Sequence, residues 1–260
     1  MKRCLAVVSV SLMTGLLGSV GARAQSPFDG TWKIQVPLPS QPDIYLLQDG
    51  TFNCKTCFVP INVKADAQDH PVAGSSYVDT VSIKVVDDHT IVQTDKKDGK
   101  IVEVTTQTVS PNGRTLTLDF TRSVASGDPV KFQEVQTRVA QGPPGSHAIS
   151  GSWQTTKLEY EKPRTVTYTI VGDSLTWDAS NGQSYTARLD GTEAPFHGDP
   201  GMTSVSVKRI DNNTIEGIGK FDGRVVVTWR STVSPDGSTM TTLVEDKETQ
   251  KTHKNVAQKQ

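Results

Sequence analysis

Apolar and polar residues alternate with a period of two along several short stretches of the chain. Val166, Tyr168 and Ile170 alternate with threonines, and the same alternation recurs over 80–85 and 204–208. A period of two places the apolar residues on one face of a β-strand. No stretch shows a sustained period of 3.6, so the pattern predicts strands and no long helix.

Asn-Gly and Asp-Gly dipeptides separate these alternating stretches. They occur at 49–50, 98–99, 112–113, 181–182, 222–223 and 236–237. Both central residues of a two-residue hairpin turn need a positive φ, which these residues tolerate. The strands are therefore expected to follow one another as antiparallel hairpins.

The sequence contains an internal repeat. Residues 80–117 align without gaps with residues 204–241, and nearly half of the aligned positions are identical. Two short sequences of the form Gly-x-Trp, at 30–32 and 151–153, also correspond. A period of this length suits a repeated domain rather than a solenoid of short units.

Four segments follow from these observations. Residues 1–24 are expected to be a signal peptide, 25–141 the first β domain, 142–148 a linker rich in Gly and Pro, and 149–260 the second β domain.

The signal peptide is predicted from three features. Lys2 and Arg3 precede an apolar stretch from Leu5 to Leu17, and Ala22-Arg23-Ala24 fits a cleavage site. The apolar stretch is too short to span a membrane. The expected location is therefore the periplasm or the outside of the cell.

Short antiparallel strands leave unpaired edges unless the sheet closes on itself or packs against another sheet. The predicted fold is all-β, with two tandem antiparallel meander β-barrels of about eight to nine strands each, and two β-sandwiches are the alternative. A barrel of about eight strands has room for side chains or for one small ligand.

Phe28-Asp29-Gly30-Thr31-Trp32, followed by a run of hairpins, resembles the opening of the calycin group, which contains the lipocalins and fatty-acid-binding proteins. The resemblance implies an arginine near the last strand that packs on the tryptophan, and Arg138 is the matching residue. The second copy departs from this pattern, with Lys254 near that place. The tandem arrangement also resembles exported bacterial proteins of unassigned function.

Charge excludes some partners. The chain has 27 basic and 28 acidic residues, and removal of residues 1–24 takes away three basic residues and no acidic one. It also lacks a basic run interleaved with aromatic residues. Nucleic acid and anionic membrane surfaces are therefore not expected as partners.

Cys54 and Cys57 are the most distinctive chemical motif. In an exported protein a disulfide is the expected state of such a pair, and a redox-active pair is the alternative. Phe58 stands where haem attachment would need a histidine, and a zinc site would need two further ligands. No cofactor and no metal are expected.

Other residues carry weaker signals for catalysis. Gly172-Asp173-Ser174-Leu175 matches a motif of lipases and esterases, but it lies where a hairpin turn is expected. The five histidines are His70, His89, His147, His197 and His253. We assign no catalytic residue from the sequence.

Three functional hypotheses follow. The first is a non-catalytic binding protein that holds a small apolar or amphipathic ligand, with Val166, Tyr168 and Ile170 lining the barrel. The second is a structural or interaction protein of the cell envelope, with filled barrels. The third is a hydrolase or isomerase that uses a loop histidine, His70 or His197. Trp32 and Trp153 are expected to be structural core residues.

Overall fold

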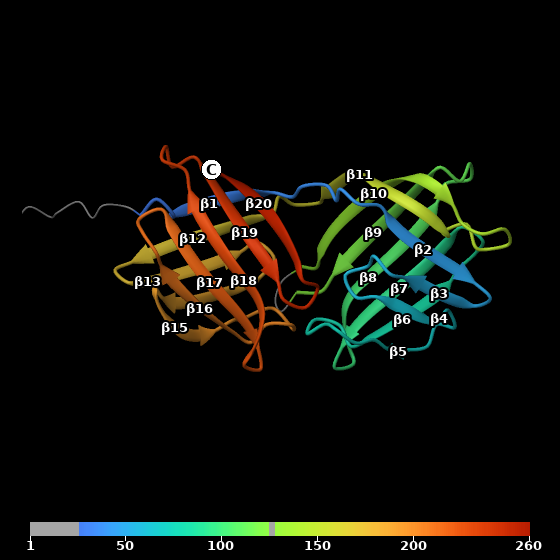
Figure 1. Ribbon diagram of the computed structural model, residues 1–260, viewed down its shortest axis with the longest axis horizontal. Coiled ribbons are helices and arrows are strands. Elements are labelled where there is room, and N and C mark those ends of the chain that lie inside the picture. Colours follow the sequence, from blue (N-terminus) through green and yellow to red (C-terminus); the bar gives the residue numbers. More distant parts are fainter. Residues whose placement is uncertain (1–25, 125–127) are drawn as a thin grey trace, which may run out of the picture.

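The computed structural model describes residues 26–124 and 128–260. In this part every regular element is a β-strand, and Figure 1 shows two barrel-like sheets that lie side by side. The predicted fold of two antiparallel barrels is confirmed. Each sheet has ten strands, slightly more than the eight or nine expected. The predicted signal peptide lies outside the described residues.

The N-terminal barrel has the strand order β4-β3-β2-β11-β10-β9-β8-β7-β6-β5. Its strands are β2 (Asp43–Gln48), β3 (Thr51–Cys54), β4 (Ile61–Lys64), β5 (His70–Pro71), β6 (Thr80–Val85), β7 (Thr90–Lys97), β8 (Lys100–Val109), β9 (Thr115–Arg122), β10 (Val130–Gln141) and β11 (Gly151–Tyr160). At the opening of this sheet β4 lies near β6, and Ala67 N, in the loop after β4, donates a hydrogen bond to Ile83 O of β6.

The C-terminal barrel has the strand order β14-β13-β12-β1-β20-β19-β18-β17-β16-β15. Its strands are β1 (Gly30–Gln35), β12 (Thr165–Val171), β13 (Ser174–Ala179), β14 (Ser184–Arg188), β15 (Asp190–Pro195), β16 (Ser204–Arg209), β17 (Thr214–Phe221), β18 (Arg224–Val233), β19 (Thr239–Asp246) and β20 (Lys251–Lys259). A bridge between Ser184 and His197 joins the two edges.

The two barrels exchange their first strands. β1 pairs with β12 and β20, whereas β11 pairs with β10 and β2. The chain therefore crosses between the barrels at 36–42 and again at 161–164, and Figure 1 shows the blue β1 among the red and orange strands. Each Gly-x-Trp strand completes the barrel built by the rest of the other copy.

The segment 142–148 differs in role from the linker that the sequence suggests. It connects β10 to β11, which pair with each other within the N-terminal barrel. The connections between the barrels are instead made by 36–42 and 161–164, and 36–42 contains Pro37, Pro39 and Pro42. Proline fixes φ and removes a backbone donor, so this segment does not join either sheet.

The repeat in the sequence is reproduced in the structure. β6 to β9 and β16 to β19 begin at positions that differ by a constant 124 residues. A bulge follows Asp95 in β7, and the same bulge follows Gly219 in β17. Three Asp-Gly turns, including Asp98-Gly99 and Asp222-Gly223, have positive φ at both residues. At 112–113, 181–182 and 236–237 only the glycine has positive φ, because these loops are longer than two residues.

The two tryptophans of the Gly-x-Trp sequences occupy equivalent buried positions. Trp32 Nε1 donates to Phe28 O, and Trp153 Nε1 donates to Ile149 O, each at 2.8 Å. Both side chains are fully buried. Gly151 has φ +139°, and a Cβ there would lie 2.4 Å from Ala140 O, so only glycine fits.

The cation on each tryptophan comes from the strand that ends one of the sequence copies, β10 for Trp153 and β20 for Trp32. The Arg138 guanidinium lies 3.9 Å from the Trp153 ring centroid, not against Trp32. In the other barrel, Lys259 Nζ lies 5.1 Å from the Trp32 ring. The residue matching Arg138 is therefore Lys259 rather than Lys254.

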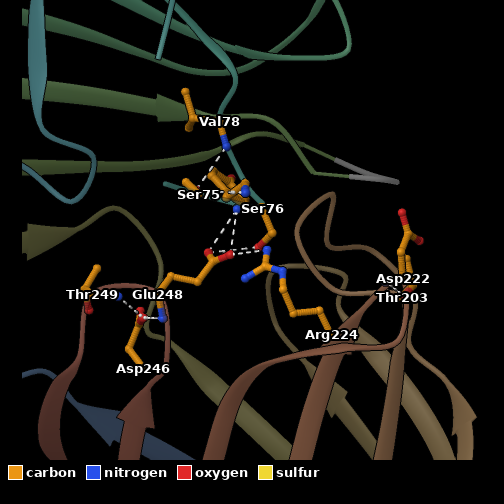
Figure 2. A network of polar contacts seen from close by, with 10 residues as sticks. Ser75, Ser76, Val78, Thr203, Asp222, Arg224, Asp246, Glu248 and Thr249 are labelled. Carbon is orange, nitrogen blue, oxygen red and sulfur yellow. Dashed lines mark hydrogen bonds and ion pairs between the residues drawn. The ribbon is translucent and has the colours of Figure 1, made fainter. Parts of the chain in front are cut away.

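Polar contacts join the two barrels. The Glu248 carboxylate accepts hydrogen bonds from Ser76 N and Ser76 Oγ of the N-terminal barrel, and Arg224 Nη2 lies 2.6 Å from Glu248 Oε1 (Figure 2). Nearby, Lys97 Nζ lies 5.1 Å from the ring centroid of Phe221. Because Glu248 is almost fully buried here, these contacts tie the facing ends of the barrels together.

Candidate ligand-binding site

The lumen of the C-terminal barrel contains a cavity of about 320 Å³. Most of its lining is apolar or aromatic. The lining residues are Ile34, Val166, Tyr168, Trp177, Gln183, Tyr185, Phe196, Met202, Val227, Trp229, Ser231, Met240, Thr242, Val244, His253, Asn255, Val256 and Ala257. A concave, mainly apolar cavity with a few polar groups is typical of small-molecule sites.

Of the three lining residues predicted from sequence, two lie in the cavity wall. Val166 and Tyr168 of β12 line it, because alternate residues of the strand face the lumen. Ile170 follows on the same face and packs partly buried against the same core, outside the cavity. Its backbone N donates to Asp29 Oδ1 at 2.7 Å.

Three aromatic rings form one wall of the cavity. Trp177 and Tyr185 stack with centroids 5.3 Å apart, and Phe196 lies 5.8 Å from Tyr185. Trp177 and Tyr185 face each other because β13 and β14 pair them across the ladder. Such pairs add to the stability that burial provides.

On the side of the cavity formed by β17 and β18, two glycines leave room for the larger side chains beside them. A Cβ on Gly217 would lie 2.1 Å from the Trp229 ring, and a Cβ on Gly219 would lie 2.3 Å from the Met202 sulfur. Gly217 pairs directly with Trp229 in the ladder. Without side chains at these two positions, Trp229 and Met202 can lie against the strand and leave the lumen open.

The surroundings of this cavity have low polarity. Burial raises the pKa of Tyr168 to about 12 and raises the pKa of Tyr185 well above its ordinary value. Both phenols are therefore neutral at physiological pH. The wall offers hydrogen-bonding groups but no charged carboxylate or ammonium group.

The lumen of the N-terminal barrel contains polar side chains instead. The Gln136 amide donates hydrogen bonds to Asp43 Oδ2 at 2.9 Å and to Glu134 Oε1 at 2.8 Å. Thr155 donates to the same Glu134 carboxylate. Burial and the neighbouring Asp43 and Glu134 carboxylates raise the pKa of Tyr45 well above its ordinary value. This network occupies space that is open in the C-terminal barrel.

A second cavity, of about 410 Å³, lies between the barrels. Both barrels contribute charged side chains to its wall, and those of the N-terminal barrel have the clearest pairing. They include Asp95, Glu103 and Arg122. Arg122 Nη2 lies 2.6 Å from Glu103 Oε2, and burial raises the pKa of Asp95 to about 7.

The expected disulfide between Cys54 and Cys57 is present. It closes the loop that leaves β3, and Cys57, Phe58 and Val59 of this loop line the cavity between the barrels. The second copy has Trp177 at the position of Cys54, because each faces the corresponding tyrosine across the ladder. The disulfide therefore holds a cavity-lining loop that is specific to the N-terminal barrel.

The histidines do not form a catalytic constellation in the described residues. His70 Nε2 lies 2.8 Å from Asp66 Oδ1 at the surface of the N-terminal barrel, and His197 is exposed on the other barrel. His147 Nε2 lies 2.7 Å from the Asp87 carbonyl, beside the His89 turn. Of the five histidines only His253 lines the apolar cavity, and no motif in the sequence marks it.

The esterase-like motif is a hairpin turn. Gly172 and Asp173 connect β12 to β13, and Val171 pairs with Ser174 across the turn. Gly172 has φ +63°, as such a turn requires. Among residues 26–124 and 128–260 we find no group of three potential metal ligands and no helix long and apolar enough to cross a membrane.

The aromatic cavity was only partly predictable. The alternation in β12 indicated Val166 and Tyr168, but Trp177, Phe196 and Trp229 come from three other strands or loops. The sequence signal that could have indicated the cavity is a difference between the two copies. Gly217, Gly219 and Trp229 replace Gln93, Asp95 and Thr105 of the first copy. No family model matches the sequence, and no curated protein shows a significant match to it.

Proposed function

We propose that this protein is an exported, non-catalytic binding protein that holds a small apolar or amphipathic molecule in the lumen of its C-terminal barrel. The observation that carries the proposal is the cavity of about 320 Å³ with its aromatic wall. Burial of apolar surface is worth roughly 25 cal/mol per Å², so such a wall favours an apolar guest. A calycin-like relationship would fit this mode of binding.

Export is supported by two independent features. The sequence begins with the pattern of a signal peptide, and Cys54 and Cys57 form a disulfide. Disulfides form and persist in oxidising compartments such as the periplasm.

A structural role is the second candidate, and it applies to the N-terminal barrel. Its lumen carries the network of Gln136, Asp43 and Glu134, and it contacts the other barrel through Ser76 and Glu248. In this proposal the N-terminal barrel supports the binding barrel and closes one side of the site.

Calorimetric titration with decanol tests the proposal. Val244 of β19 lines the cavity, and Phe120 occupies the equivalent position in the N-terminal barrel. We expect Val244→Phe to weaken decanol binding about ten-fold or more, because the added ring occupies the lumen.

Leu243→Phe is the matched control. Leu243 is the next residue on β19, and its side chain is 48% exposed. The control should bind decanol as the unaltered protein does. Absence of decanol binding to the unaltered protein, or equal binding by Val244→Phe, would contradict the proposal.

A further inference from the structure

The apolar lumen adjoins the cavity between the barrels. The two cavities have volumes of about 320 and 410 Å³, and they share Gln183, Met202 and Val227 as lining residues. A single molecule can therefore place an apolar body in the C-terminal barrel and a polar end between the barrels.

Carboxylates outnumber cations at the polar end. The cavity between the barrels is lined by five carboxylates and one guanidinium: Asp95, Glu103, Asp199, Asp246, Glu248 and Arg122. The Arg122 guanidinium is engaged by Glu103, through Nε at 2.7 Å and Nη2 at 2.6 Å. Arg224, next to the cavity, is engaged by Glu248. Both cations thus already have a carboxylate partner.

Asp95 and Asp199 have only neutral partners. Asp95 Oδ1 accepts from the Gln93 amide at 2.9 Å, and Asp199 accepts from Gln183 and from Gly201 N. In the described part of the chain, neither carboxylate forms an ion pair with Lys, Arg or His. Burial raises the pKa of both groups, and the nearby Arg122 guanidinium, which is already paired with Glu103, only partly offsets this effect.

The hydrogen-bond network behind Asp95 has an excess of acceptors. Gln93 Oε1 accepts from Gln107 Nε2 at 3.4 Å, and Gln107 is 3% exposed. Gln107 Oε1 is buried and has no hydrogen-bond partner among the described residues. A buried acceptor without a donor costs free energy. A guest that donates hydrogen bonds fits this end, whereas a carboxylate would add another acceptor.

We propose that the ligand is an amphipathic amine, with its apolar body in the lumen of the C-terminal barrel and its protonated nitrogen between the barrels beside Asp95. This inference rests on the proposed function and specifies the chemical class of its ligand. The ammonium group supplies the positive charge and the donors that Asp95 and Asp199 lack. The aromatic wall supplies the apolar contact.

Three probes with the same alkyl chain test the inference: decylamine, decanol and decanoate. Calorimetry with the full mature chain at about pH 8 compares their dissociation constants, because the amine is protonated there. We expect decylamine to bind about ten-fold or more tightly than decanol, and decanoate to bind most weakly. Asp95→Asn should reduce the affinity for decylamine to that for decanol and leave decanol binding unchanged.

Asp173→Asn is the matched control, since it removes the same charge from the exposed β12–β13 turn. If Asp95→Asn fails to fold, as judged by circular dichroism, Asp199→Asn makes the same comparison. Equal affinities for decylamine and decanol, or tightest binding of decanoate, would overturn the inference and leave the proposed function intact. If none of the three probes binds, the proposed function itself fails.

Discussion

The two barrels share one strand plan and differ in what their lumens contain. At five equivalent positions of β7–β8 and β17–β18, the N-terminal barrel has Gln93, Asp95, Glu103, Thr105 and Gln107 where the C-terminal barrel has Gly217, Gly219, Val227, Trp229 and Ser231. The ladder, its bulge and its turns are the same in both. Backbone pairing therefore fixes the barrel, and the inward side chains decide whether its lumen is polar or apolar.

The comparison continues on the last strand. Gln136 pairs with Leu116 in one barrel, and Ala257 pairs with Met240 at the same place in the other. A buried amide brings hydrogen-bonding partners into the lumen, whereas alanine leaves space. The difference is consistent with the proposal that one barrel supports the other, in which the ligand binds.

The largest expected effect tests which barrel each tryptophan belongs to. Trp153→Ala should lower the free energy of unfolding by about 3–5 kcal/mol, because it removes a fully buried ring. The loss of protection should appear in the N-terminal barrel, although Trp153 belongs to the second sequence copy. Hydrogen exchange measured by mass spectrometry would locate it. Deprotection centred on 165–259 would contradict the strand exchange.

A pH effect of up to about 4 kcal/mol is expected from Asp95, since each unit of pKa shift corresponds to about 1.4 kcal/mol. Its pKa is about 7 in the folded protein, above its ordinary value of 3.8. The unfolded chain therefore releases this proton first, and stability should fall as the pH rises from about 4 to about 7.

Asp95→Asn should flatten this part of the stability profile, as measured by urea unfolding at several pH values. Asp199 contributes in the same direction and remains in the variant. In the C-terminal barrel the position of Asp95 is Gly219, so the effect belongs to the N-terminal barrel. An identical profile for the variant would show that Asp95 is ordinarily solvated.

Placing a polar residue of the N-terminal lumen at the equivalent position of the C-terminal lumen should weaken ligand binding. Val227→Glu introduces the residue that the N-terminal barrel has at this position, Glu103. A carboxylate in the apolar lumen should weaken decanol binding about ten-fold or more. Val225→Glu, on the outer face of β18, is the control and should bind normally. Equal affinities of the two variants in calorimetry would argue against the lumen as the site.

A smaller effect is expected from the cations over the tryptophans. The Arg138 guanidinium donates to the carbonyl oxygens of Gly113, Ser150 and Ala148, whereas among the described residues Lys259 Nζ donates only to Pro27 O. Arg138→Lys should lower the free energy of unfolding by about 1–2 kcal/mol, because lysine cannot make the same set of contacts. Urea unfolding measures this, and an unchanged midpoint would refute it.

The strands were predictable from sequence because their signals are local. The alternation over 204–208 and the turn at 222–223 each report on neighbouring residues only. The strand exchange was not predictable, because β1 and β11 carry the same Gly-x-Trp pattern and fit either barrel. Which barrel each of these two strands joins depends on the connections at 36–42 and 161–164.

On β20, the last strand of the chain, the residue that matches Arg138 was not identified correctly from the sequence. The sequence places Lys254 only near the position of Arg138 in the second copy, whereas the structure places Lys259 over Trp32. The separation between Arg138 and Lys259 is 121 residues, the same as between the two Gly-x-Trp sequences. The cavity could not be predicted either, because its wall joins side chains that lie far apart in the sequence.

Fluorine NMR of the protein labelled with 5-fluorotryptophan tests the central claim most directly, because the chain has only four tryptophans. Titration with decanol should shift the resonances of Trp177 and Trp229, which line the lumen of the C-terminal barrel, and leave that of Trp153 in place. Spectra without any shift, or a saturable shift of Trp153 equal to theirs, would contradict the assignment of binding to this barrel.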